Sequence, residues 1–154
     1  MIALIQRVSF AEVKIDGAVH SSIQQGMLIL LGIAADDDET HGKWLAGKIS
    51  RLRIFSDNEG KMNLDLPTAG GDAMVISQFT LMADVSHGNR PSYTDAARPE
   101  KAIPLYEAFL KELSAAMGKE VACGKFGADM KVSLCNDGPV TLQIDSREHL
   151  KKQN

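Results

Sequence analysis

The chain has 154 residues, of which 44% are hydrophobic and 24% are charged. This composition predicts one globular domain whose hydrophobic core is stable without disulfides or bound metals. No apolar run approaches the roughly 18 residues that a membrane span needs. A formal net charge of −3 excludes a protein that wraps duplex nucleic acid through many phosphates. We therefore expect no membrane partner and no DNA partner, and only a small, local contact with any other nucleic acid.

The N-terminal part of the chain predicts three strands. Residues 1–17 carry β-branched and apolar residues in partial alternation. They end at Asp16-Gly17, a two-residue hairpin signal before a second strand at 18–24. Residues 26–33 (GMLILLGI) are apolar on both faces, which is typical of a central strand that is covered on both sides.

The sequence then changes to a helical period within residues 36–55. The acidic run at 36–39 suits a solvated helix N-terminus, where carboxylates meet the positive end of the helix dipole. The apolar stripe of this predicted helix consists of Trp44, Leu45, Ile49 and Leu52. Residues 53–66 predict a strand, a turn and a second strand, and residues 68–85 predict a turn followed by one long apolar strand.

The last third begins with a polar loop at 86–100 and continues as a helix at 99–118. Pro99 suits its first turn and Gly118 suits its C-terminal end. Its apolar residues follow helical spacing: Ile103, Tyr106, Leu110, Leu113 and Met117. Two further strands are predicted at 130–135 and 140–145, and the charged residues 146–154 predict a frayed tail.

These elements add up to an α/β protein with about eight strands and two helices. The simplest packing covers one sheet with the helices and places a second sheet behind it, which gives three layers in the order α/β/β. The domain is expected to span residues 1–145, with residues 146–154 as a separate charged tail.

Ordinary catalytic and metal-binding patterns are not found. The four histidines lie far apart in the sequence and are expected at the surface. Cys123 and Cys135 have no CxxC spacing, which argues against a disulfide framework and against a metal site. We expect Cys135 to be a small buried hydrophobe, no cofactor, no metal, and a cytoplasmic location.

Two short stretches do not fit a plain core. ISQFTL, at 76–81, puts Ser77, Gln78 and Thr80 into a strand that should otherwise be apolar; a strand end or an edge facing water would explain this. NDGPVT, at 136–141, puts Gly138-Pro139 between two predicted strands. Proline has no N–H for a sheet ladder and glycine has no side chain, so the pair offers only carbonyl oxygens, and an ordinary turn would explain it.

Taken together, SQFTL at 77–81 and NDGPVT at 136–141 resemble the two signature motifs of the D-aminoacyl-tRNA deacylases. The resemblance covers nearly the whole chain, from Met1 to about Asp145. It extends, in the same order, through QRV at 6–8, GKMNLDL at 60–66, GNRPSY at 88–93 and GKFGADM at 124–130.

The resemblance implies the deacylase fold, with mixed sheets forming a barrel-like β core, and a cytoplasmic homodimer. It implies hydrolysis of the ester that joins a D-amino acid to the 3′ CCA end of tRNA, and removal of glycine from mischarged tRNA(Ala). L-amino acids would be rejected.

The resemblance also assigns roles to residues. Gln78, Phe79 and Thr80 would form the catalytic part of the pocket, and Ser77 would line it. Phe126 and Met130 would flank the adenosine and its amino acid. Gly138 and Pro139 would arrive from the partner subunit with a cis peptide bond, and Arg7 would hold that turn. A rigid backbone wall explains how handedness could be tested without reading a side chain, because an L side chain would collide with it.

Three alternatives stay open at this point. The chain could be a non-catalytic nucleotide-binding or RNA-binding module accessory to a synthetase. It could also be a related deacylase that admits a small L-amino acid, or a metal hydrolase. Within the deacylase interpretation, either Thr80 or the 2′-OH of the substrate could carry the chemistry.

Overall fold

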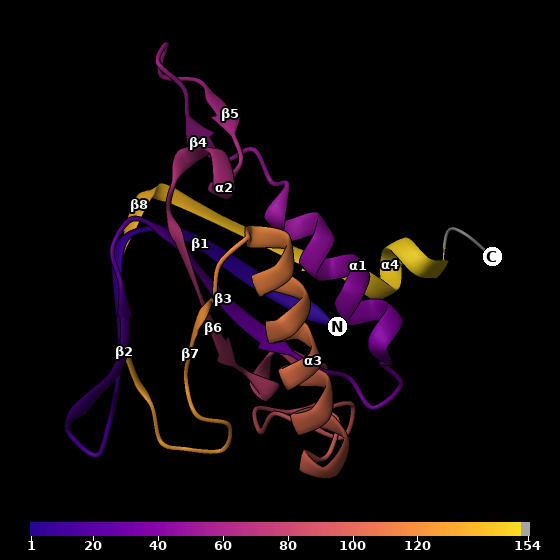
Figure 1. The fold of residues 1–154 in the computed structure, drawn as a ribbon. Coiled ribbons are helices and arrows are strands. Elements are labelled where there is room, and N and C mark those ends of the chain that lie inside the picture. The colour runs from indigo at the N-terminus through magenta and orange to yellow at the C-terminus, as the bar shows by residue number, and fades with distance from the viewer. Residues whose placement is uncertain (152–154) are drawn as a thin grey trace.

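The computed structural model describes residues 1–151, in which two long helices, α1 (Glu39–Ser50) and α3 (Pro99–Met117), cover one face of a strongly bent sheet (Figure 1). The remainder of the predicted tail, 152–154, lies outside the described residues. The strands of the sheet are β1 (Ile2–Ile15), β2 (Ala18–Ile23), β3 (Gly26–Gly32), β6 (Asp72–Ser77), β7 (Ala122–Cys123) and β8 (Lys131–Asp145). The helices are α1 (Glu39–Ser50), α2 (Leu66–Ala69), α3 (Pro99–Met117) and α4 (Ser146–Leu150), with a 3-10 turn η1 (Phe79–Met82).

The sheet is mixed and nearly closed. Its order is β2-β1-β3-β6-β7, with β8 on the other edge of β1. β3 and β6 are parallel, whereas β1 is antiparallel to β2, β3 and β8. The 14-residue β1 pairs with β3 through its first half and with β2 through its second, so the sheet curls. The hydroxyl of Ser21 in β2 donates to the carbonyl of Cys123 in β7 at 2.7 Å. This hydrogen bond joins β2 and β7, the first and last strands of the order. The expected barrel-like β core is confirmed.

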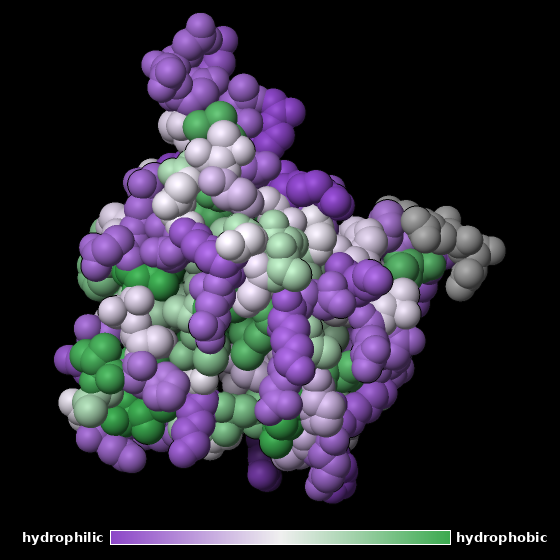
Figure 2. All heavy atoms as spheres, viewed as in Figure 1, coloured by the Kyte–Doolittle hydropathy of each residue, from purple (hydrophilic) through white to green (hydrophobic). Residues whose placement is uncertain are grey.

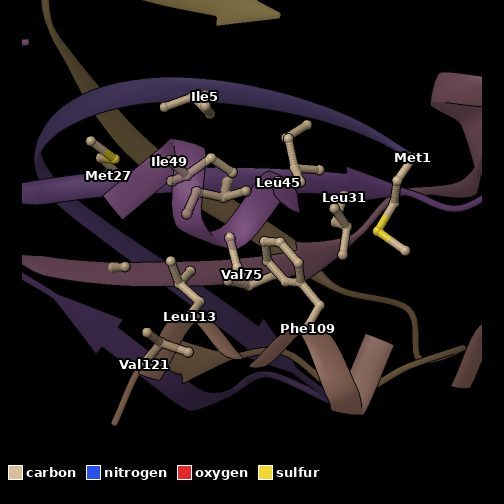
Figure 3. Packing of buried hydrophobic residues seen from close by; sticks show 14 of the residues in the cluster. Met1, Ile5, Met27, Leu31, Leu45, Ile49, Val75, Phe109, Leu113 and Val121 are labelled. Atoms are coloured by element: carbon tan, nitrogen blue, oxygen red, sulfur yellow. The ribbon is translucent and has the colours of Figure 1, made fainter. Parts of the chain in front are cut away.

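The main core lies between the two long helices and the sheet. Leu45 and Ile49 of α1 pack with Phe109 and Leu113 of α3, and Val75 of β6 lies among them (Figure 3). A second cluster fills the inside of the bend and includes Val8, Val13, Leu28, Met74 and Ile76. These two clusters lie between the predicted α/β/β layers. The helices cover one face of β3 and β6, and the other strands of the curled sheet cover the opposite face.

The start of α1 differs from the predicted solvated acidic run. Asp38 is its N-cap and accepts hydrogen bonds from the amides of Thr40 and His41. The hydrogen bond between the Asp38 carboxylate and the His41 imidazole keeps the pKa of Asp38 below its usual value. Asp37, however, is fully buried and accepts from the α-ammonium of Met1 at 2.6 Å. A buried carboxylate needs such a partner, so Asp37 is structural.

Other expectations need correction. One continuous strand, β8, replaces the two strands predicted at 130–135 and 140–145, because β1 is long enough to pair with both halves of it. The first part of the tail is α4, which is capped by Asp145 and held by Ser146, whose amide donates to the carbonyl of Met1. Ile103 is 37% exposed, and Ala102 and Leu105 are buried instead. No helix within residues 1–151 has the length and apolar character to cross a membrane.

The segment between α1 and β6 forms a small outlying hairpin. Its strands are β4 (Phe55–Ser56) and β5 (Met62–Leu64), and its tip is a hydrophilic knob that projects from the body (Figure 2). The predicted strand, turn and strand at 53–66 are confirmed in shorter form.

Candidate functional site

The SQFTL motif lies where β6 ends. The amide of Gln78 still donates to the carbonyl of Leu31 at 2.8 Å, but the chain then turns into η1. The strand predicted after the turn in 68–85 is therefore present only as β6 and is shorter than predicted. A strand would point Leu81 and Met82 to opposite faces. The 3-10 turn instead lets Met82 become buried with Ile2, while Leu81 packs against the same cluster.

A cavity of about 190 Å³ opens at this strand end. Its lining combines the ends of β3 and β6, the segment that enters α3, and the segment between β7 and β8. The lining residues are Leu31, Ile33, Ser77, Gln78, Phe79, Ala97, Ala102, Phe126, Gly127, Ala128 and Met130. None of them carries a titratable side chain, so the cavity is neutral and mainly apolar.

Hydrogen bonds within the motif involve amide and hydroxyl groups. The side-chain amide of Gln78 donates to the hydroxyl oxygen of Thr80. An amide N–H cannot take a proton from a hydroxyl, so this contact does not activate Thr80 as a nucleophile. The side chain of Thr80 is exposed and lies outside the cavity lining.

Phe126 is held by a buried tyrosine behind it. The rings of Tyr106 and Phe126 lie 6.0 Å apart, and the Tyr106 hydroxyl donates to the carbonyl of Val75 at 2.8 Å. Burial raises the pKa of Tyr106 well above its usual value, so the hydroxyl remains a donor. Tyr106 therefore ties the wall of the cavity to the centre of β6.

The NDGPVT motif forms a short excursion from β8, here called the Gly-Pro loop (residues 137–139). The ladder with β1 pairs Gln6 with Thr141 and Val8 with Asn136, so the loop bulges out between these two pairs. The Gly138-Pro139 peptide bond is cis, and all three loop residues are exposed.

Two side chains brace the Gly-Pro loop. Asn136 accepts from the amide of Val140 at 2.9 Å and donates to its carbonyl at 3.2 Å. Arg7 donates to the carbonyl of Asp137 at 3.0 Å and to that of Ile54 at 2.7 Å. Gly138 has φ +139°, and a Cβ there would lie 2.8 Å from Val140 Cγ2 and 3.2 Å from an Arg7 guanidinium nitrogen. The site therefore requires glycine.

The Gly-Pro loop and the cavity of one chain are separate. On β3, Arg7 pairs with Met27 whereas Ser77 pairs with Leu31. Four residues of strand put them roughly 13 Å apart along β3 alone. The loop lies instead beside Ile54, at the base of the β4–β5 hairpin (Figure 1).

The nine residues with predicted site roles lie in two clusters of the chain. Ser77, Gln78, Phe79, Phe126 and Met130 line the cavity, with Thr80 next to them. Arg7, Gly138 and Pro139 form the second cluster. Leu31 and Ile33 were missed, although their two-residue spacing on GMLILLGI could have indicated a shared face. Asn136 was missed as well, although it opens the second motif.

The histidines and Cys135 lie only partly where the sequence predicts them. His20 and His87 are exposed as expected, but His41 belongs to the helix cap and His149 stacks on Trp44 at 4.2 Å. Cys135 is exposed, because it points outward on β8, so its predicted burial is wrong. Among residues 1–151 no group of three His, Cys, Asp or Glu residues is arranged to hold a metal ion.

The fold and the site define a class of small α/β proteins with a neutral ligand cavity at the ends of two parallel strands and a rigid glycine-proline projection elsewhere on the sheet. Residues 4–145 match the family model described as D-Tyr-tRNA(Tyr) deacylase. The chain belongs to this family.

Similar proteins agree over almost the full length. A D-aminoacyl-tRNA deacylase of Opitutus terrae is 56% identical over 95% of this chain and 97% of its own. One of Porphyromonas gingivalis is 58% identical over the same shares. A solved structure titled c-Myc DNA unwinding element binding protein superposes with a TM-score of 0.90 at 36% identity, covering 94% of this chain and 98% of its own. A probable eukaryotic D-amino acid tRNA deacylase shares the fold, with a TM-score of 0.80 at 14% identity over 93% and 97%.

Proposed function

We propose that this protein hydrolyses the ester bond between a D-amino acid and the terminal adenosine of tRNA, and so removes D-amino acids before translation uses them. Membership of the deacylase family carries this proposal. The neutral cavity supports it, because the terminal nucleoside of a single-stranded CCA end offers an uncharged base that can stack on Phe126 and pack against Met130.

The size of the cavity supports a two-chain site. At about 190 Å³ it is smaller than the roughly 300–1,000 Å³ typical of complete ligand pockets. It can hold one part of an aminoacyl-adenosine while the rest lies at its mouth. We propose that a second copy of the chain covers this mouth with its Gly-Pro loop, since the loop is exposed and cannot reach the cavity of its own chain.

Such a loop would explain selection by handedness. Its carbonyl oxygens can accept from the ammonium group of the substrate, and Gly138 lets the wall approach closely. An L side chain would then collide with backbone, whereas a D side chain would point to open space. Glycine has no side chain and would pass the same test, so we expect glycyl-tRNA(Ala) to be a substrate too. Arg7 and Asn136 would act as positioning residues, because they fix the loop.

The chemistry would depend on main chain and substrate. The cavity lining offers no general base, and Thr80 accepts from an amide. We propose that the free 2′-OH of the terminal adenosine activates water or takes part directly. The first amides of η1 have no partner inside the turn and would stabilise the oxyanion, an effect worth roughly 2.7–4 kcal/mol per donor in other hydrolases.

Single-turnover deacylation of D-Tyr-tRNA by purified protein tests the proposal. Wild type should release D-tyrosine, Thr80→Ala should retain much of this rate, and a substrate ending in 2′-deoxyadenosine should react far more slowly. Binding without hydrolysis would favour the non-catalytic RNA-binding alternative. Complete loss in Thr80→Ala, together with normal cleavage of the 2′-deoxy substrate, would make Thr80 the nucleophile.

A further inference from the structure

An exposed aromatic pair extends from the cavity onto the surface. Phe79 lines the cavity yet is 55% exposed, and Tyr93 is 41% exposed. Their ring centroids lie 5.1 Å apart with the planes at 72°. Tyr93 is not part of the cavity lining. The edge-to-face contact therefore continues the aromatic surface by one ring beyond the mouth.

The loop that carries Tyr93 is fixed on both sides of this residue. Asp84 and Ser92 exchange two backbone hydrogen bonds, at 2.8 and 2.9 Å, and so close the loop before Tyr93. The carbonyl of Tyr93 accepts from the amide of Ala96 at 3.1 Å, and Ala96 pairs with Ala34 just beyond β3. The fixed loop therefore holds two adjacent exposed rings in place, and such a surface is preformed for a stacking partner.

The same loop has the charge that a phosphodiester would need. Residues 85–94 contain His87 and Arg90 and no acidic residue; Asp84 and Asp95 flank this stretch, and the carboxylate of Asp84 is engaged by the amide of Ser86 at 2.9 Å. Arg90 is exposed, and within residues 1–151 it forms no ion pair. Tyr93 and this guanidinium thus belong to one loop, and proteins hold single-stranded nucleic acid by combining aromatic faces with cationic groups.

We propose that Tyr93 stacks on the base of the nucleotide that precedes the terminal adenosine, and that Arg90 contacts a phosphate of the same strand. This inference rests on the proposed function, which places the terminal nucleoside in the cavity beside Phe79. The strand must then leave over the rim, where Tyr93 is the next ring. Stacking tolerates any base, so Tyr93 adds affinity for the common CCA end without selecting among tRNAs.

A double-mutant cycle tests the stacking. The substrates are two RNA minihelices charged with D-tyrosine, one with an intact CCA end and one that lacks the base of the penultimate nucleotide. Tyr93→Ala should raise the half-saturating concentration of the intact minihelix by at least about fivefold and should have a much smaller effect on the abasic one. Tyr93→Phe should restore wild-type behaviour, because it keeps the ring.

Val85→Ala is the matched control, since Val85 lies in the same loop, is 65% exposed and has no ring. It should behave as wild type on both substrates. Equal loss on both substrates in Tyr93→Ala, or an equal loss in Val85→Ala, would overturn the stacking role while hydrolysis by the wild type upholds the proposed function. A wild type that cleaves neither minihelix would refute the proposed function and this inference with it.

Discussion

Gly32→Ala is the substitution that tests most directly whether the turn after β6 forms the site. Gly32 ends β3 directly beneath η1. A Cβ at this position would lie 2.9 Å from Leu81 Cβ, 2.9 Å from Met82 Cε and 3.1 Å from the carbonyl oxygen of Gln78. Ordinary carbon contacts need roughly 3.5–4.0 Å, so the turn must retreat by roughly 0.6–1 Å.

The expected losses follow from this displacement. Overpacking of this kind destabilises by roughly 1–3 kcal/mol, which lowers Tm by about 2–12 °C in a chain of this size. Misplacement of a catalytic turn by 1 Å can reduce the rate by about 100-fold. We therefore expect kcat/KM for D-Tyr-tRNA to fall by roughly 10- to 100-fold at a temperature where both proteins are fully folded.

Gly42→Ala is the matched control. Gly42 lies inside α1, where an added Cβ would lie 3.5 Å from Met1 Cε, an ordinary contact. Helical glycine-to-alanine changes stabilise by roughly 0.5–1 kcal/mol, so Tm should rise and kcat/KM should not change. Wild-type kcat/KM in Gly32→Ala would refute the reasoning, because it would mean that the position of η1 is not needed for activity.

Three further predictions concern the supports of the fold and the site. Arg7→Met should lower kcat/KM for D-Tyr-tRNA, because the Gly-Pro loop loses its guanidinium donor, and Arg7→Lys should restore it only in part, since one ammonium cannot reproduce the fork; steady-state kinetics check this. Asp37→Asn leaves the α-ammonium of Met1 buried without its carboxylate, so urea unfolding should show a loss of about 3–5 kcal/mol; an unchanged midpoint would contradict the buried pair. Burial alone would raise the pKa of Asp145, but hydrogen bonds from Arg147 lower it overall. Its contribution to stability is therefore present above its unfolded pKa of about 3.9 and is lost as the pH falls below it. Asp145→Asn should flatten the stability curve in that range, and a curve that remains parallel to wild type would contradict the assignment.

Local sequence patterns were sufficient for the main elements of the fold. Apolar alternation located β1 and β2, and the two-sided apolar run of residues 26–33 located the central β3. Helical spacing located α1 and α3. These signals depend only on which face of an element is buried, so one chain segment is enough to see them.

Features that depend on distant contacts were missed. The helix α4 forms because Ser146 hydrogen-bonds to the carbonyl of Met1, and nothing in SREHL itself records that contact. The strand at 72–77 gives way to η1 because Met82 must join Ile2, which comes from the other end of the chain. Polar residues within an apolar strand did indicate the position of the site, since Ser77 and Gln78 had no core role to explain them.

The proposed selection by handedness depends on the backbone wall of the Gly-Pro loop. Its most direct test is the ratio of kcat/KM for D-Tyr-tRNA to that for L-Tyr-tRNA, in wild type and in Gly138→Ala. We predict that wild type cleaves the D substrate and spares the L substrate. Gly138→Ala should lose D-substrate turnover. Its Tm should fall as well, because φ +139° is strained for alanine and the Cβ would lie 2.8 Å from Val140 Cγ2, so kcat/KM is compared at a temperature where both proteins are fully folded. Normal cleavage of D-Tyr-tRNA by Gly138→Ala, or equal cleavage of both substrates by wild type, would contradict the proposed selection.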